Sequence, residues 1–151
     1  MDDDPHLGED WPRVLSSNRQ NDRAISDEEL RTLARDTLRA EGVVGPAELS
    51  LSFVDAEEIA ELHERFMDES GPTDVLSFPL DELDEEGVRL LGDVVVAPGE
   101  AARNNPDEPD AEIRLLVVHG ILHILGYDHE EDVARTRMWD RQERYSGVRA
   151  P

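Results

Sequence analysis

The sequence of 151 residues contains no cysteine and no lysine, and it has no long uninterrupted apolar segment. Without cysteine, disulfides, thiolate metal sites and a cysteine nucleophile are all excluded. A membrane-spanning helix needs about 18 or more consecutive apolar residues, which this chain lacks. Because residues 1–10 are acidic where a signal peptide is basic, we expect a cytoplasmic protein with no membrane partner.

Acidic residues are abundant instead. The chain carries 37 Asp and Glu residues against 15 Arg, which gives a formal net charge of −22. That mean field repels phosphate and argues against general electrostatic binding to nucleic acid. Since 38% of the residues are hydrophobic, the chain can still fold as one domain. We expect an acidic disordered tail at residues 1–11, a folded domain at 12–145 and a C-terminal tail at 146–151.

The charge is distributed unevenly along the chain. Residues 111–151 hold seven acidic side chains and six Arg, a net of −1, so residues 1–110 carry the other −21. Acids are densest at residues 1–10 and 81–86, where mutual repulsion predicts a solvated tail and a loop tip. Chemistry on a polyanion is therefore expected in the last third of the chain.

Local patterns predict an α+β domain with a small mixed sheet packed with helices. Ser26 and Glu29 form a capping box that opens a helix, which we expect to end at Gly42. Asp55 can cap a second helix. Strands are expected where apolar residues alternate or cluster, at 49–53, 75–80 and 90–97, the last two forming a hairpin around the acidic loop. A loop at 104–109 precedes the last two expected helices, one from residue 111 to Gly126 and one from about 130 to 145.

The segment at residues 119–129, His-Gly-Ile-Leu-His-Ile-Leu-Gly-Tyr-Asp-His, carries the chemical signal. On a helix His119 and His123 lie about 40° apart around the axis, so they share a face. Gly126 can end the helix and turn the chain so that His129 reaches the same ion. Three imidazoles leave the fourth tetrahedral position open for water, as in catalytic zinc sites. We predict a metal site on this helix and the following turn; zinc is favoured, although nickel, copper or iron also suit three nitrogens.

The same spacing occurs in metzincin proteases, with one decisive difference. Those enzymes carry a Glu directly after the first His, and it deprotonates the metal-bound water. Here that position is Gly120. The metal-binding pattern is present and the proteolytic base is not, which disfavours peptide hydrolysis.

Three motifs together resemble the YbeY family of bacterial endoribonucleases, the rRNA maturation factors. They are the histidine motif, Thr-Asp-Val-Leu-Ser-Phe-Pro at residues 73–79 and Leu-Gly-Asp at 91–93, and they occur in the family's order. The resemblance implies one Zn²⁺ per chain held by His119, His123 and His129, which act in catalysis through a metal-bound water. It also implies cleavage of single-stranded RNA, maturation of the 3′ end of 16S rRNA and ribosome quality control. The expected partners are rRNA and the small ribosomal subunit or assembly factors, and no DNA.

Further residues are candidates around this motif. Asp128 can accept the second N–H of a ligating imidazole, and Ser77 and Thr73 can donate hydrogen bonds to phosphate. Each of these three also has an ordinary structural explanation, as a turn residue or a hydroxyl bonded to nearby backbone. Arg103, Arg114 and His63 are candidates for substrate binding. The Arg that the family commonly carries six residues before Thr73 is replaced by Met67.

Two alternatives to the nuclease remain from the sequence alone. The first is a metal-dependent protease, which Gly120 disfavours. The second is a metal-stabilised ribosome-assembly protein that binds RNA without cutting it, a role to which Met67 gives some weight.

Overall fold

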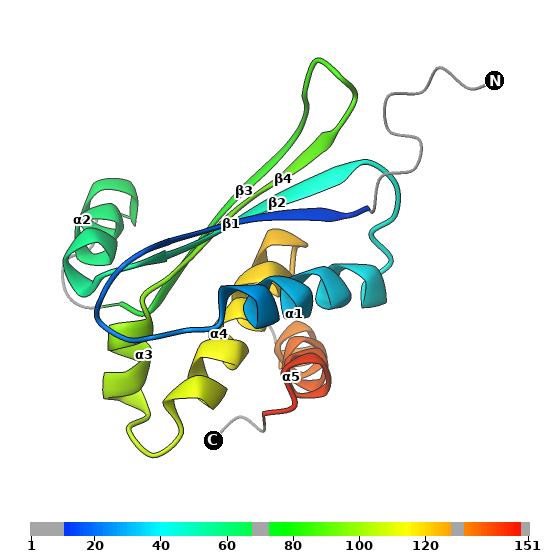
Figure 1. Cartoon of the computed structure of the whole chain (residues 1–151). Helices are drawn as coiled ribbons and strands as arrows, with labels where there is room; N and C mark the ends of the chain where they lie inside the picture. The colour runs from blue at the N-terminus through cyan, green and yellow to red at the C-terminus, as the bar shows by residue number, and fades with distance from the viewer. Residues whose placement is uncertain (1–10, 68–72, 128–131, 149–151) are drawn as a thin grey trace.

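The computed structural model describes residues 11–67, 73–127 and 132–148 (Figure 1). Within these ranges the chain forms a four-stranded sheet and five helices. The strands are β1 (Arg13–Arg19), β2 (Ala47–Val54), β3 (Val75–Leu83) and β4 (Arg89–Val96). The helices are α1 (Asp27–Ala40), α2 (Ala56–Met67), α3 (Pro98–Asn104), α4 (Pro109–Ile124) and α5 (Asp132–Ser146).

The sheet is mixed, with the strand order β1-β2-β4-β3. β1 pairs with β2 and β2 with β4 in parallel, whereas β3 and β4 form an antiparallel hairpin. This arrangement confirms the expected single-domain α+β class. The acidic tail expected at residues 1–11 lies outside the described residues except for Trp11.

The helix starts predicted from capping residues are confirmed. The Ser26 hydroxyl accepts a hydrogen bond from the backbone N–H of Glu29 at the start of α1. The Asp55 carboxylate accepts one from the N–H of Glu58 at 2.8 Å, at the start of α2. Both side chains satisfy backbone donors that have no partner within the helix.

The acidic segment at residues 81–86 is only partly a loop, which corrects the sequence prediction. Its first three residues continue β3 past an irregularity after Pro79, where Asp81 has a φ of 56°. The Asp81 carboxylate pairs with Arg89 of β4 at 2.9 Å. This cross-strand attraction offsets part of the repulsion among the acids, so the hairpin extends further than the charge pattern predicts.

Two elements have no counterpart in the sequence prediction. The strand β1 contains one buried apolar residue, Val14, so it lacks the alternation that marks a half-buried strand. The short helix α3 begins at Pro98 and ends at Asn104, which was expected to start a loop. β1 depends on a neighbour distant in sequence, because it pairs along its whole length with β2.

Helices cover one face of the sheet and part of the other. α1 and α4 pack on the first face around buried side chains that include Leu51, Phe53 and Val94. α2 covers one end of the opposite face, against Leu76 and Val95. Val94 and Val95, which are adjacent in β4, therefore face opposite sides of the sheet, as the pleat of a strand requires. α5 lies against α4 on the side away from the sheet (Figure 1).

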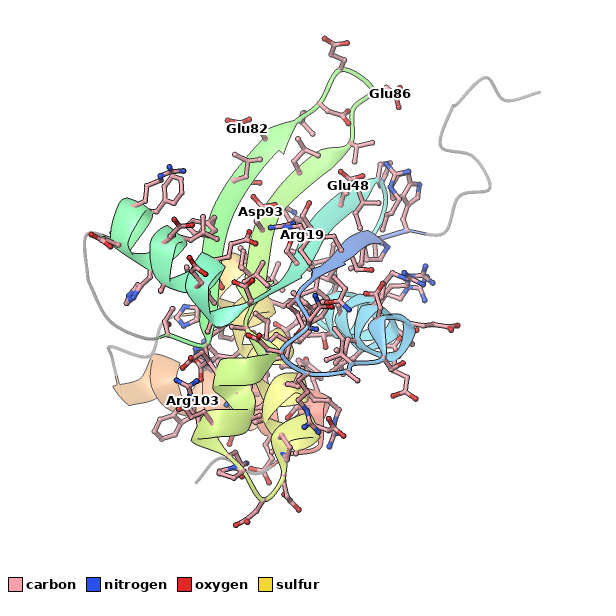
Figure 2. All side chains as sticks on the ribbon, turned by 60° about the vertical axis from the view of Figure 1, so that its left-hand side comes forward. Arg19, Glu48, Glu82, Glu86, Asp93 and Arg103 are labelled. Atoms are coloured by element: carbon pink, nitrogen blue, oxygen red, sulfur yellow. The ribbon has the colours of Figure 1, made fainter. Side chains whose placement is uncertain are left out.

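The opposite face of the sheet carries charged side chains where α2 does not cover it. Figure 2 shows Glu48 and Asp93 there, with Glu82 and Glu86 further out on the hairpin. In the part of the chain that the structure describes, no helix has the length and hydropathy to cross a membrane.

Candidate active site

The two histidines of α4 are neighbours on one face of a buried helix. Most of the side chains of α4 from Ile113 to Ile124 are buried, while His119 and His123 are half-buried. Their ring centroids lie 4.6 Å apart with an interplanar angle of 72°. The spacing of four residues predicted this shared face.

A pocket of about 280 Å³ adjoins these rings. One wall is α4, with His119 and His123, and the other is the edge strand β3. The residues of β3 that line it are Val75, Leu76, Ser77 and Pro79. Ser77, a candidate for phosphate contact, is thus brought to the same pocket as both histidines.

Gly120 explains how α4 comes so close to the sheet. A Cβ atom at this position would lie 2.6 Å from Cγ1 of Val94 and 3.2 Å from Oγ of Ser77. The Ser77 hydroxyl donates a hydrogen bond of 3.1 Å to the carbonyl of Gly120. The position where metzincin proteases carry their catalytic Glu is filled here by the sheet, so it has no room for a side chain.

A second glycine permits close packing at the end of α4. Gly92 of β4 has a φ of 141°, and a Cβ there would lie 2.4 Å from the carbonyl oxygen of Phe78 and 2.9 Å from Cδ1 of Ile124. Gly92 belongs to the Leu-Gly-Asp motif at residues 91–93. The motif therefore serves the contact between the hairpin and the histidine helix.

The turn after α4 begins as predicted. Gly126 has a φ of 100°, a conformation that glycine adopts without steric cost. Its N–H bonds the carbonyl of His123, and the N–H of Tyr127 bonds that of Leu122, each at 3.0 Å. These two bonds close a Schellman motif that ends the helix. Asp128 and His129, the predicted positioning residue and third metal ligand, lie outside the described residues.

Gln142 of α5 contacts the first histidine, a contact that no pattern in the sequence predicts. Its side-chain oxygen lies 2.7 Å from Nδ1 of His119, and Gln142 is only 4% exposed. The two residues are 23 positions apart and share no recognisable motif. Only the packing of α5 against α4 brings them together.

A second polar cluster holds the residue that follows Gly126. The carboxylate of Glu41 accepts hydrogen bonds from the hydroxyls of Tyr127 and Tyr145 and from Nε of Arg141. Burial raises the pKa of Glu41, but these donors and the Arg141 charge outweigh it, and the net pKa is lowered. Burial and the bond to Glu41 raise the pKa of Tyr145 to about 12. The cluster joins α1, α5 and the turn that leads toward His129.

The other candidate residues do not line the histidine pocket. The Thr73 hydroxyl bonds the carbonyl of Val75 at 3.4 Å. Arg103 projects from α3 with a 73% exposed side chain and pairs with Glu100 at 3.2 Å (Figure 2). Arg114 lies about 140° around the α4 axis from His119 and lines another pocket, with Ser26 and Asp110. His63 lies half-buried on α2.

The helix α2 continues through the position where the family carries Arg. Because α2 ends at Met67, Arg65 lies on the same regular helix, about 200° around the axis from Met67. Arg65 instead lies over the ring of Phe66, 5.9 Å from its centroid. It therefore does not replace the missing Arg by a shift of two residues.

The donor set of the described residues suits a metal such as zinc, in part. Across residues 11–67, 73–127 and 132–148 no three metal-binding side chains gather, so His119 and His123 supply two of the three expected ligands. Gln142 contacts the ring of His119 through Nδ1. Neutral imidazole with its second nitrogen bonded to the protein is the usual form of a zinc-binding histidine.

Comparison with protein families gives one family for nearly the whole chain. Residues 15–147 match the model described as Endoribonuclease YbeY. This match includes all the candidate residues named above.

Individual relatives agree with that match. The chain is 46% identical over 127 residues to Endoribonuclease YbeY of Beutenbergia cavernae, covering 78% of this chain and 85% of the relative. It is 41% identical over 140 residues to the protein of the same name from Streptomyces coelicolor, covering 85% of each. The solution structure of TM1509 from Thermotoga maritima superposes with a TM-score of 0.59 at 31% identity, covering 88% of this chain and 86% of that one.

Proposed function

Because the chain belongs to the YbeY family of endoribonucleases, we propose that it is a zinc-dependent enzyme that cuts single-stranded rRNA. The ligands in this proposal are His119, His123 and His129, with one Zn²⁺ per chain. Its biological role is maturation of the 3′ end of 16S rRNA and ribosome quality control, in the cytoplasm and with the small subunit or its assembly factors as partners.

One observation carries the assignment of the reaction centre. His119 and His123 present two imidazoles, 4.6 Å apart between centroids, to a pocket that also contains Ser77. Bound there, zinc supplies Lewis-acid chemistry suited to a phosphodiester. At about 280 Å³ the pocket is slightly smaller than the usual range of ligand sites, about 300–1,000 Å³.

The chain's own residues orient the reacting groups. The side-chain oxygen of Gln142 lies 2.7 Å from Nδ1 of His119, within hydrogen-bond distance of that ring. Ser77 donates its one hydroxyl proton to the Gly120 carbonyl, so toward substrate or water its oxygen accepts a hydrogen bond rather than donating one to phosphate. Val75, Leu76 and Pro79 line the strand side of the pocket with apolar side chains.

The charge of the chain fits a substrate delivered by a larger partner. At −22 the protein repels RNA in general, which favours recognition in the context of the ribosome over unaided capture of free RNA. The near-neutral charge of residues 111–151 keeps the histidine motif from adding to that repulsion.

Neither alternative from the sequence is favoured. The metzincin mechanism requires a side chain at Gly120, where Val94 and Ser77 leave no space. The family is one of endoribonucleases, so a protein that only binds RNA has Met67 alone in its favour.

Substitution of His123 by Ala tests the proposal. We expect His123→Ala to release about one zinc per chain and to abolish cleavage of single-stranded RNA, because a site with three ligands cannot spare one. Elemental analysis measures the metal content, and a labelled single-stranded RNA measures cleavage. Casein is the substrate that tests for protease activity. Asp107→Ala, in the exposed segment between α3 and α4, is the control and keeps both properties. Full metal content in His123→Ala would refute the ligand assignment.

A further inference from the structure

The contact between α5 and the histidine helix has a consequence for metal binding. We propose that Gln142 is a positioning residue that selects the nitrogen with which His119 binds metal. This inference rests on the proposed zinc site, but the contact itself involves only residues that the structure describes.

The chemistry of the two groups determines the tautomer. A neutral imidazole has one N–H donor and one acceptor nitrogen. The side-chain oxygen of Gln142 can only accept, and it lies 2.7 Å from Nδ1 of His119. With the amide oxygen facing the ring, as it is placed here, the proton is on Nδ1, and Nε2 carries the lone pair that a metal requires.

The surroundings of Gln142 hold its backbone against α4. One turn earlier on α5, Met138 is fully buried against Val118 and Leu122 of α4. One turn later, the hydroxyl of the buried Ser146 donates to the carbonyl of Gln142. Val118 directly precedes His119 in α4. The packing of Met138 on Val118 therefore holds the backbones of α4 and α5 in place next to the contact between His119 and Gln142.

Burial makes the contact consequential. Gln142 is only 4% exposed, so water cannot easily take the place of His119 as the hydrogen-bond partner of its side-chain oxygen. Outer partners of ligating histidines typically contribute about 10- to 100-fold to metal affinity, because they fix ring orientation and raise basicity. Among the residues that the structure describes, Gln142 lies where it can fix the ring orientation of His119 and raise its basicity.

The first test needs neither metal nor RNA. In metal-free wild-type protein, at a pH where the ring is neutral, long-range ¹⁵N–¹H NMR spectra should show His119 as the Nδ1–H tautomer. Gln142→Leu, which keeps the bulk and removes the acceptor, should shift the ring toward the Nε2–H form that prevails for free imidazole side chains. An Nε2–H tautomer in the wild type would overturn the proposal even if no variant folds.

The second test measures zinc itself. We expect Gln142→Leu to lower zinc affinity about 10- to 100-fold, and Gln142→Glu, which keeps an acceptor oxygen, to restore it. The matched control is Gln20→Leu, which removes another buried amide that bonds Asn18 and Arg23. It should lower stability and leave zinc affinity unchanged. Equal zinc affinity in Gln142→Leu and wild type would contradict the proposal.

The two tests separate this inference from the proposed function. If wild-type protein binds no zinc, the zinc site fails, and the NMR result still decides whether Gln142 sets the His119 tautomer. If zinc binds but Gln142→Leu leaves tautomer and affinity intact, only the role of Gln142 fails.

Discussion

Gly120, a single residue, controls the distance between the histidine helix and the sheet. Its missing Cβ leaves room for Val94, and its carbonyl accepts the Ser77 hydroxyl. Compared with the metzincin pattern, Gly120 stands where those proteases carry their catalytic Glu. The structure adds the physical reason, which is packing between α4 and the hairpin.

Adding one methyl group at this position tests that reason. We expect Gly120→Ala to lower the free energy of unfolding by about 1–3 kcal/mol, the usual cost of overpacking. This cost should exceed the gain of about 1 kcal/mol that alanine brings to a helix. Urea denaturation measures the difference. In a Val94→Ala background the cost should largely disappear; an equal cost in both backgrounds would show that Val94 is not the obstacle.

Glu41 predicts a dependence of stability on acidity. Its pKa is lowered in the folded protein, because the bonds from Tyr127, Tyr145 and Arg141 outweigh the effect of burial. The ionised carboxylate therefore stabilises the fold above its unfolded pKa of 4.5, and this contribution is lost as pH falls through the lower folded value. The stability difference between wild type and Glu41→Gln should be largest near neutral pH and shrink below about 4.5 in urea titrations. A difference that stays constant with pH would contradict this role of Glu41.

The titration of the two tyrosines of the chain at alkaline pH tests the same cluster around Glu41. Burial and the bond to Glu41 raise the pKa of both, that of Tyr145 to about 12. Their phenolate absorbance should therefore appear above pH 10, and that of Tyr145 near pH 12. Their stabilising contribution is complete below the unfolded pKa and lost as pH rises through the folded one. In Glu41→Ala the absorbance transition should move toward the ordinary tyrosine value; an unmoved transition would exclude Glu41 as its cause.

Elements with a local signal were predictable from the sequence, and elements held by distant partners were not. The capping residues Ser26 and Asp55 predict the starts of α1 and α2, and the alternation of apolar and polar residues in 49–53 predicts β2. Helix capping and strand alternation both involve residues that are close in sequence, so the sequence shows them directly. β1 has no such signal and exists by pairing with β2. The candidate site divides in the same way: the spacing of His119 and His123 is local, whereas Gln142 depends on tertiary packing.

The attachment of α5 to α4 is itself open to test. Met138 is fully buried between these helices, against Val118 and Leu122. We expect Met138→Ala to cost about 2–5 kcal/mol of stability, as for other large-to-small core changes. Trp139→Ala, at the half-exposed neighbouring position, should cost less. Chemical denaturation of both variants compares them, and equal costs would show that α5 is not held through Met138.

At the scale of the whole molecule, one group of acids lies apart from the proposed reaction centre. The acids that Figure 2 labels on the hairpin and the open sheet face, Glu82, Glu86, Glu48 and Asp93, lie on the side away from α1, α4 and α5. The formal charge of the chain is −22, whereas residues 111–151, which contain the histidine motif, carry a net charge of only −1 along the sequence.

Metal content and RNA cleavage, measured on one sample, test the central claim most directly. The purified chain should contain about one zinc, lose cleavage of single-stranded RNA when a chelator removes the metal, and regain cleavage when zinc is returned. Undiminished cleavage by protein that elemental analysis shows to be free of metal would contradict the account.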